Sequence, residues 1–343
     1  MPGYTHNNNC NVTIGAEMIT IKQVAELAGV SPSTASYALN NRPEVKEETV
    51  QRVLEAARKL NYVPNKVAQS FRNGKTNTIC VITSESIEHA NTFSNEFFGI
   101  LAGAREKHYD VLVKLLEAST DTKQETLNIM GNRTSDGYIL LVNSLDHVAE
   151  YVVSNGIKAV LLSSHTQFPI SQVNVDGRKW ISEMTELVLK SGRKNLAYFT
   201  FELLTVEETL RLQGFQSALQ KHQIVNDKFV FCCGYSAEKL ENSIENCIQN
   251  NIDAIICWND LLAIQTINAL SKMNISVPKD ISVTGFDDIV NGIDPLHGLT
   301  TVKQPFFEKG REAVRLLISH LNGQQVEPVN QFLDCTIIQR QSI

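Results

Sequence analysis

A short stretch near the N-terminus gathers side chains that can form hydrogen bonds in several directions. Positions 31–40 read SPSTASYALN, in which the hydroxyl and amide groups both donate and accept hydrogen bonds. If this stretch is helical, its apolar residues face inward on one side. The side chains left facing outward are then Ser33, Thr34, Ser36, Tyr37 and Asn40. A surface of this kind suits the recognition of polar groups on a binding partner.

Motifs for bond-making chemistry do not occur in the sequence. It has no phosphate-binding Walker loop, no His-Glu-x-x-His metal motif and no Gly-x-Ser-x-Gly nucleophile motif. The seven cysteines show no Cys-x-x-Cys spacing, which predicts reduced thiols, no metal site and no cofactor. Cys232 and Cys233 would point to opposite faces of a strand, so we expect them to fill the core rather than act in redox chemistry. The sequence therefore favours a binding protein over an enzyme.

Three predicted helices must position the polar stretch. Thr20 begins a capping box with Gln23, and Gly29 ends the first helix. Ser31 and Pro32 are a good cap and first residue for the second helix, and a third helix follows with apolar residues at helical spacing. Two short helices joined by Gly-Val form a helix-turn-helix. A three-helix protein-interaction module is the alternative, but the polar and basic outer face favours DNA.

Formal charge is distributed unevenly along the chain. The whole sequence carries −6 at pH 7, which by itself argues against nucleic-acid binding. Residues 18–75, however, contain nine Lys and Arg residues against five Asp and Glu, so the rest of the chain carries −10. A basic head on an acidic body keeps the attraction to phosphate local to the head.

From residue 77 onward, short apolar runs alternate with helical patterns. The predicted strands cover 78–83, 110–116, 137–142, 158–163, 195–200, 254–258 and 281–286. Runs of Val, Ile and Leu that alternate with helices indicate buried parallel sheets, here in two doubly wound lobes. Ligands of such folds bind at the carboxyl ends of the strands, so we expect a binding site between the lobes.

The N-terminal extension differs from a targeting segment. Residues 1–17 contain no Lys or Arg and no long apolar segment, so they do not form a signal peptide. They are polar and Asn-rich, which predicts disorder. Because the helical pattern begins just after Met18, we expect Met18 to be the true start. No run reaches the roughly 18 apolar residues of a membrane span, and the expected location is the cytoplasm.

The sequence resembles a known family over nearly its whole length. The motifs are TIKQVAELAGVS, RVLEAA and LNYVPN in the head, and RLQGFQSAL (211–219), WNDLLAIQTINAL (258–270), VPKDISVTGFDD (277–288) and LTTVKQP (299–305) in the body. They resemble the lactose-repressor/galactose-repressor family of bacterial transcription regulators. The resemblance implies an all-α helix-turn-helix head with a hinge helix. It also implies a two-lobed α/β body with parallel sheets, similar to periplasmic sugar-binding proteins.

The resemblance also implies a division of the chain into domains. We expect a disordered extension over 1–17, a helix-turn-helix domain over 18–64, a hinge helix and linker over 65–76, and an effector-binding and dimerisation domain over 77–343. The two lobes of this last domain are an N-lobe of about 77–174 and 305–332, and a C-lobe of about 175–304 and 333–343. The tail has no leucine heptad, so we expect a homodimer.

Members of the family read a palindromic operator with the second helix of the head in the major groove. Carried over position by position, the resemblance implies DNA contacts at Thr20, Ser31, Pro32, Ser33, Thr34, Ser36, Tyr37, Asn40 and, in the hinge, Ala68 and Phe71. Tyr37 and Phe71 stand where relatives commonly carry Arg and Leu, so the base preference is expected to differ. Alternatively, Tyr37 packs on the third helix and Phe71 packs on the hinge of the partner.

The resemblance implies effector contacts at Ser84, Phe93, Arg211, Tyr235, Asn259, Asp287, Gln304 and Phe306. Carboxylate, amide and guanidinium groups can bracket vicinal hydroxyls, so a mono- or disaccharide is the expected effector. Structural alternatives are a surface charge for Arg211, a turn cap for Asp287, and core packing for Tyr235 and Phe306. Asp176 is expected to cap a helix rather than bind a ligand.

The residues that depart from the family pattern leave the particular sugar open. Ser163 and Ser164 replace a common acidic residue and Arg, and Trp258 stands where many relatives have a small residue. The predicted function is repression of a carbohydrate-utilisation operon, relieved when a sugar binds. The alternatives are a regulator whose corepressor, a purine or a phosphoprotein, tightens DNA binding, and a solute-binding sensor without DNA function.

Overall fold

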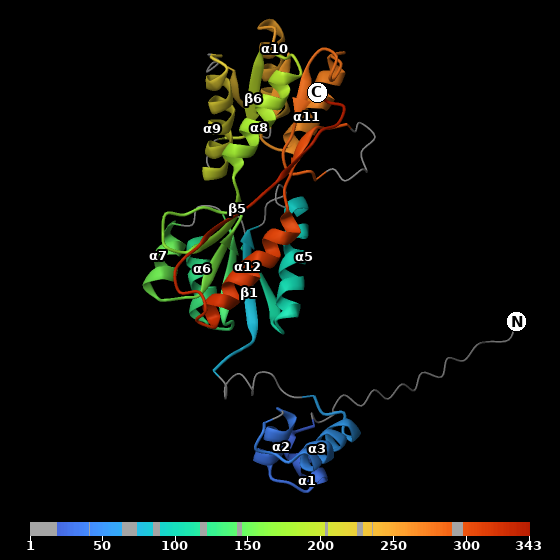
Figure 1. Ribbon diagram of the computed structural model, residues 1–343, viewed down its shortest axis with the longest axis vertical. Helices are drawn as coiled ribbons and strands as arrows, with labels where there is room; N and C mark the ends of the chain where they lie inside the picture. The colour runs from blue at the N-terminus through green and yellow to red at the C-terminus, as the bar shows by residue number, and fades with distance from the viewer. Residues whose placement is uncertain are drawn as a thin grey trace, which may run out of the picture. The chain divides into compact units, whose positions relative to one another are not determined.

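The computed structural model describes residues 19–40, 42–63, 74–84, 90–116, 122–142, 146–202, 205–224, 229–234, 236–289 and 298–343. The chain divides into two compact units, Met1–Thr76 and Asn77–Ile343, and each is described by itself (Figure 1). The predicted extension, the proposed start at Met18 and the predicted hinge helix lie outside the described residues.

The described residues of the first unit contain three helices, α1 (Ile21–Ala28), α2 (Pro32–Leu39) and α3 (Glu47–Lys59). The predicted capping box is present, with the Thr20 N–H donating to Oε1 of Gln23 at 2.7 Å. Gly29 ends α1 in the left-handed conformation, with φ 64°. The Ser31 hydroxyl accepts the N–H of Thr34 and caps α2. These helix ends are confirmed.

The core of the first unit lies where the three helices meet. It is made by Val24, Ala25, Ala28, Ala35, Ala38, Val50, Val53, Ala56 and Ala57. The prediction that Ser36 faces outward is wrong, because Ser36 is only 3% exposed. α2 packs against both α1 and α3, so more than one side of this short helix is covered, and the small Ser36 side chain is enclosed beside Ala35.

The second unit contains two α/β lobes, of which the first is here called the N-lobe. Its six-stranded parallel sheet has the order β11-β5-β4-β3-β1-β2. The strands are β1 (Thr78–Ser84), β2 (Asp110–Leu116), β3 (Gly137–Leu141), β4 (Ala159–Leu162), β5 (Ser171–Val175) and β11 (Asn330–Leu333). Helices cover both faces of this sheet (Figure 1).

Alternate residues of the N-lobe strands point to opposite faces of the sheet. Cys80 and Ile82 pack in the core beneath α6 (Thr122–Gly131) and α7 (Asp146–Ser154). Ile79 and Val81 pack on the other side, in the core formed with α5 (Ala90–Glu106) and α12 (Phe306–Leu321). Burial on both faces explains why these strands read as continuous apolar runs.

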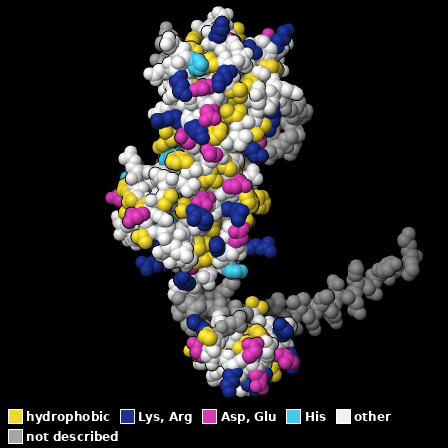
Figure 2. Space-filling model, viewed as in Figure 1, with side chains coloured by type: hydrophobic (Ala, Val, Ile, Leu, Met, Phe, Trp, Pro, Cys, Tyr) yellow, Lys and Arg dark blue, Asp and Glu magenta, His cyan; other side chains and the backbone are white. Residues whose placement is uncertain are grey.

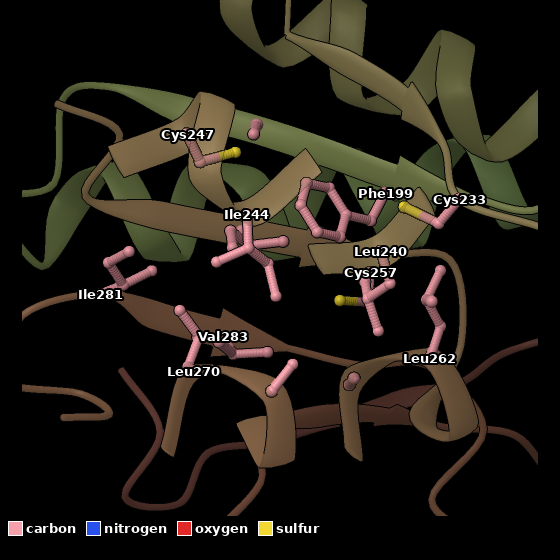
Figure 3. Close-up of a cluster of buried hydrophobic side chains, with 14 of the residues drawn as sticks. Phe199, Cys233, Leu240, Ile244, Cys247, Cys257, Leu262, Leu270, Ile281 and Val283 are labelled. Carbon is pink, nitrogen blue, oxygen red and sulfur yellow. The ribbon is translucent and has the colours of Figure 1, made fainter. Parts of the chain in front are cut away.

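The second lobe, here called the C-lobe, is built around a four-stranded parallel sheet in the order β7-β6-β8-β9. The strands are β6 (Leu196–Thr200), β7 (Val230–Cys232), β8 (Ala254–Cys257) and β9 (Ser282–Thr284), and the helices are α8 (Gly177–Lys190), α9 (Val206–Lys221), α10 (Ala237–Gln249) and α11 (Asp260–Lys272). Figure 3 shows the core under α10 and α11, where Phe199 and Val283 of the sheet meet Ile244 and Leu270. An antiparallel pair, β10 (Thr301–Lys303) and β12 (Thr336–Ile338), joins the C-lobe beside β9.

The chain passes between the lobes after β5, after β10 and again after β11. The second passage brings α12 back to pack on α5 of the N-lobe. At this contact the backbones nearly touch, because Gly310 lies against the carbonyl group of Glu96 and Gly99 lies against that of Phe307. A Cβ atom at either glycine would overlap the facing carbonyl oxygen, so the close approach depends on glycine.

All seven predicted strands are present, with ends that agree within about two residues. The helical head and the parallel sheets confirm the predicted fold class. β5, β7, β10, β11 and β12 were not predicted. Cys232 is exposed and Cys233 is buried, so the two side chains do point to opposite faces, but Cys233 alone fills the core.

Candidate functional site

The first unit presents a polar face on and around α2. The exposed residues of the predicted DNA-contacting set are Thr20, Ser31, Pro32, Ser33, Tyr37 and Asn40. Tyr37 exposes half of its surface, so part of its ring is available to a partner. Thr34 is half-buried, and its hydroxyl pairs with that of Ser31 at 2.8 Å. Ser36 is buried and does not contribute to this face.

In the second unit, buried polar side chains connect the two lobes. Lys309 of α12 lies 2.8 Å from the Glu96 carboxylate of α5, and each of these side chains is only 3% exposed. The Lys309 ammonium also donates to Oγ of Ser163 at 2.5 Å and to Oε1 of Gln304 at 3.1 Å. Ser163 follows β4 and donates to Oε1 of Glu96 at 2.5 Å. The ammonium is therefore surrounded by oxygen atoms from three segments of the chain.

Gln304 connects these side chains to the C-lobe. Its Nε2 donates to Oδ1 of Asp287 at 2.7 Å, and that oxygen lies 3.9 Å from Nη2 of Arg211 on α9. The guanidinium of Arg211 lies 3.8 Å from the ring centre of Phe286 and 4.7 Å from that of Trp258. Arg211 is buried, so it is not a surface charge, and Nη1 donates to the Trp258 carbonyl oxygen at 2.8 Å. Cation–π contacts and this hydrogen bond fix its position.

A second link between the lobes involves His165, which follows β4, and Glu207 at the start of α9. Nε2 of His165 and Oε1 of Glu207 form a short hydrogen bond. Burial alone would raise the pKa of Glu207, but the hydrogen bond from His165 and the charge of Arg211 outweigh it and lower the pKa. Glu96, Ser163, His165, Glu207, Arg211, Asp287, Gln304 and Lys309 are called the interlobe network below.

Two buried carboxyl groups lie in the C-lobe part of the site. Burial raises the pKa of Asp287 to about 6, against the opposing charge of Arg211. Burial, together with the charge of Asp287, raises the pKa of Asp260 to about 8. Asp260 begins α11 and joins two segments, because its carboxyl oxygens accept from the Thr301 hydroxyl at 2.5 Å and from the Ile289 N–H at 2.9 Å. It therefore anchors the chain that follows Asp287.

The raised pKa of Asp260 makes the stability of the folded chain depend on pH. Asp260 ionises near its usual pKa of 3.8 in the unfolded chain and near 8 in the folded chain. Between these values the folded state binds more protons, so its contribution to stability is complete below about pH 4 and is lost as pH rises toward about pH 8. We expect Asp260→Asn to remove this loss, because its amide oxygen can accept from the Ile289 N–H and its NH₂ group can donate to the Thr301 hydroxyl once that hydroxyl turns to accept.

The measurement is thermal unfolding between about pH 5 and about pH 8. At the upper end the variant should be more stable than the parent by on the order of 4 kcal/mol. Asp253→Asn is the control, because the Asp253 carboxylate accepts backbone N–H groups in an exposed position. If Asp260→Asn kept the pH dependence of the parent, Asp260 would be ionised in the folded state.

The structure brings together three residues of the predicted effector set, Arg211, Asp287 and Gln304. Phe306 is buried at the start of α12, with the Lys309 ammonium 5.2 Å from its ring centre. Asn259 is buried and caps α11 by accepting the Leu262 N–H at 2.9 Å. Asp176 caps α8, as expected.

Several predicted residues cannot be located in the structure. Tyr235, Ala68 and Phe71 lie outside the described residues, as do the side chains of Ser84 and Phe93. Their roles stay predictions.

Sequence reasoning missed Asp260 and four residues of the interlobe network, Glu96, His165, Glu207 and Lys309. A signal was present for two of them. Glu96 lies four residues before the buried Ile100 on α5, and Lys309 lies on the buried stripe of α12 between Phe306 and Ala313. A charged residue on an apolar helical face indicates either a buried ion pair or a binding site.

The described residues hold no group of three or more His, Cys, Asp or Glu side chains that could bind a metal ion. Among the helices in the same ranges, none has the length and apolarity needed to cross a membrane.

Comparison with known proteins identifies relatives for both units. Residues 20–65 match the lacI family of bacterial regulatory proteins, and residues 185–343 match the periplasmic binding protein-like domain. The transcriptional regulator RegA of Clostridium acetobutylicum is 30% identical over 336 residues, which cover 94% of this chain and 98% of RegA. The transcriptional repressor CytR of Escherichia coli K12 is 26% identical over 94% of this chain and 96% of CytR.

Among solved structures, the Lac repressor dimer bound to operator and the anti-inducer ONPF has a TM-score of 0.83 and 27% identity. The alignment covers 95% of this chain and 99% of the Lac repressor chain. The complex of the transcriptional regulator CelR with cellobiose has a TM-score of 0.70 at 23% identity, covers 94% of this chain and 99% of its own, and supports the fold alone. The helix-turn-helix head, the two parallel-sheet lobes and the full-length match to RegA agree. The chain therefore belongs to the lacI family of bacterial regulatory proteins and is a DNA-binding transcriptional regulator, not an enzyme.

Proposed function

We propose that this regulator represses a carbohydrate-utilisation operon and leaves its operator when a mono- or disaccharide binds between the lobes. One observation carries the proposal. The Arg211 guanidinium contacts the rings of Phe286 and Trp258, while its Nη2 lies 3.9 Å from the Asp287 carboxylate, too far for a hydrogen bond. Both groups keep hydrogen-bonding capacity for hydroxyls, which donate and accept.

The coupling between sugar and DNA follows from the connections between the lobes. A sugar that contacts Asp287 on the C-lobe would disturb Gln304, which also accepts from Lys309 of the N-lobe. The relative position of the lobes would then depend on the ligand. Because coupling is reciprocal, the sugar must bind the DNA-free form more tightly by the same factor by which it weakens DNA binding.

We propose a homodimer that forms through the N-lobe. β2 is an edge strand with Val113 and Leu115 exposed, and the neighbouring α5 exposes Phe98 and Leu101. Apolar side chains are visible over α5 in Figure 2. An exposed edge strand beside an apolar helix face is a surface that a second copy can cover. The Lac repressor, similar over the full chain, was solved as a dimer on operator DNA.

The domain division expected from the sequence is part of this proposal. Residues 18–64 would read a palindromic operator, residues 65–76 would form the hinge, and residues 77–343 would bind the effector and dimerise. Within the hinge, Ala68 and Phe71 would enter the minor groove. The exposed residues around α2 would contact base edges and phosphates in the major groove. Ser36 is left out of this set because it is buried.

The test uses fluorescence anisotropy on an operator selected from random DNA, with and without a panel of saccharides. Release of DNA by one saccharide supports the proposal. Tighter operator binding in the presence of a purine or a phosphoprotein would instead establish a corepressor. Absence of any salt-dependent DNA affinity would contradict a DNA-binding role altogether.

Tyr37→Ala is expected to change which operator is preferred. A side chain that reads a base edge contributes about 1–3 kcal/mol of discrimination at its position, so the variant should lose preference at one base pair per half-site. Lys22→Ala is the comparison, since Lys22 is exposed on α1 and a lost phosphate contact weakens all sequences alike. Selection from random DNA measures both. An unchanged preferred sequence for Tyr37→Ala would remove Tyr37 from the base-reading residues.

A further inference from the structure

Within the interlobe network, each cation already has carboxylate partners. Lys309 lies 2.8 Å from Glu96, and Arg211 lies 3.9 Å from Asp287 and 3.7 Å from Glu207. Two cations therefore face three carboxylates. His165, which pairs with Glu207, is the remaining group in the network that can carry positive charge. The site has no surplus positive charge to offer a ligand.

The second unit places few other positive charges near the interlobe network. Among the described residues, no other Lys or Arg lies within ion-pair distance of Glu96, Glu207 or Asp287. Within 77–343, the side chains outside the described ones include no Arg and two Lys, Lys123 and Lys228. They also include six Asp and Glu residues.

The local electrostatics disfavour additional negative charge. Burial raises the pKa of Asp287 to about 6 even though Arg211 opposes the shift. Burial and the nearby Asp287 raise the pKa of Asp260 to about 8. Because burial is the main cause of both shifts, a new anion beside Asp260 and Asp287 would also be poorly stabilised. A phosphate brings up to two negative charges, whereas hydroxyl groups bring none.

We propose that the effector is an uncharged saccharide and that Glu96, by neutralising Lys309, excludes phosphorylated and acidic sugars. The inference rests on the proposed sugar effector and specifies its chemical class. Glu96 is then a specificity-determining residue: its carboxylate holds the ammonium that would otherwise bind a phosphate or a carboxylate. A neutral hydroxyl can still accept a hydrogen bond from the ammonium if it replaces Ser163 or Gln304 as the acceptor.

The first experiment compares matched ligands on the full chain. Thermal shift and isothermal titration would use glucose, galactose, mannose and fructose, each with its 6-phosphate, together with glucuronate, galacturonate and a set of neutral disaccharides. We expect at least one neutral saccharide to raise Tm, and the phosphorylated or acidic counterparts to bind at least about tenfold more weakly.

Glu96→Gln then tests the residue itself. This variant keeps the shape of the side chain and leaves the Lys309 charge uncompensated, so it should gain affinity for a sugar phosphate or uronate by about tenfold or more. Glu106→Gln is the matched control, because Glu106 pairs with Arg311 across the same two helices at an exposed position. The double variant Glu96→Gln, Lys309→Met should lose the gained affinity and provides a second test if the single variant folds poorly.

The outcomes separate the two proposals. If the parent protein binds a phosphorylated or acidic sugar more tightly than its neutral counterpart, the inference is wrong while a sugar effector stands. If neutral sugars bind and folded Glu96→Gln gains no affinity for anions, Glu96 does not set the specificity. If no saccharide of either class binds the folded chain, the proposed sugar effector fails, and the inference fails with it.

Discussion

Replacing Lys309 with Ala is expected to destabilise the second unit by about 3–5 kcal/mol, the usual loss when one partner of a buried ion pair is removed. The Glu96 carboxylate would stay buried, with the Ser163 hydroxyl as its remaining donor among the described residues. An ionised group that has neither water nor a cation beside it makes folding less favourable. Thermal unfolding followed by tryptophan fluorescence measures the loss, because both tryptophans, Trp180 and Trp258, belong to this unit.

Two further variants show whether the loss comes from the buried charge. Glu106→Ala removes the exposed ion pair with Arg311 on the same two helices and should cost at most about 1 kcal/mol. Lys309→Met combined with Glu96→Leu removes both charges, and such replacements are often neutral or stabilising. If Lys309→Ala cost no more than Glu106→Ala, the Glu96 carboxylate would have to be solvated or protonated in the folded chain.

Gly310→Ala is the second substitution with a large expected effect. Its methyl group would overlap the carbonyl oxygen of Glu96, which is backbone and cannot rotate away. α5 and α12 would have to separate, and overpacking of this kind costs about 1–3 kcal/mol, here at the upper end. Because Lys309 precedes this glycine and Glu96 supplies the facing carbonyl, separation of the helices also strains the ion pair. The variant should have a lower Tm, and the effector should change its DNA binding less than it does in the parent.

Gly131 provides the comparison for this substitution. It ends α6, and a Cβ atom there would meet only the Tyr151 hydroxyl at 3.9 Å, an ordinary contact. Gly131→Ala should leave stability unchanged or raise it by up to about 1 kcal/mol, because alanine favours the helix more than glycine does. Equal behaviour of the two variants would mean that α5 and α12 do not approach at Gly310 as closely as the structure indicates.

Much of the fold could be predicted because its signals are local. Thr20 and Gln23 lie three residues apart, Gly29 follows α1 directly, and strands such as β3 are unbroken apolar runs. β5 was missed although all five of its residues are buried, because Ser171, Gln172 and Asn174 are polar. Their partners include Ser164, Thr166 and His320, and the contact with His320 spans 149 residues. No local sequence pattern shows that these polar side chains are hydrogen-bonded when they are buried.

The site was predictable where the family resemblance supplied positions, and not elsewhere. Arg211, Asp287 and Gln304 were expected by resemblance, and the structure brings them together. The partners of Lys309 are distant in sequence, since Glu96 and Ser163 differ by 67 in residue number and Ser163 and Lys309 by 146. No local sequence pattern shows that these residues pair with one another. The error at Ser36 has the same origin, since its burial depends on both neighbours of α2.

The repeated passage of the chain between the lobes has a consequence for the order in which the protein matures. Residues 298–343 supply β10 and β12 to the C-lobe and α12 and β11 to the N-lobe. This segment leaves the ribosome after the rest of both lobes, so neither lobe can complete its sheet and helices before it emerges. The core of the head lies within residues 24–57 and can form as soon as it emerges. A nascent chain therefore holds a folded DNA-reading unit before it possesses a sensor to control it.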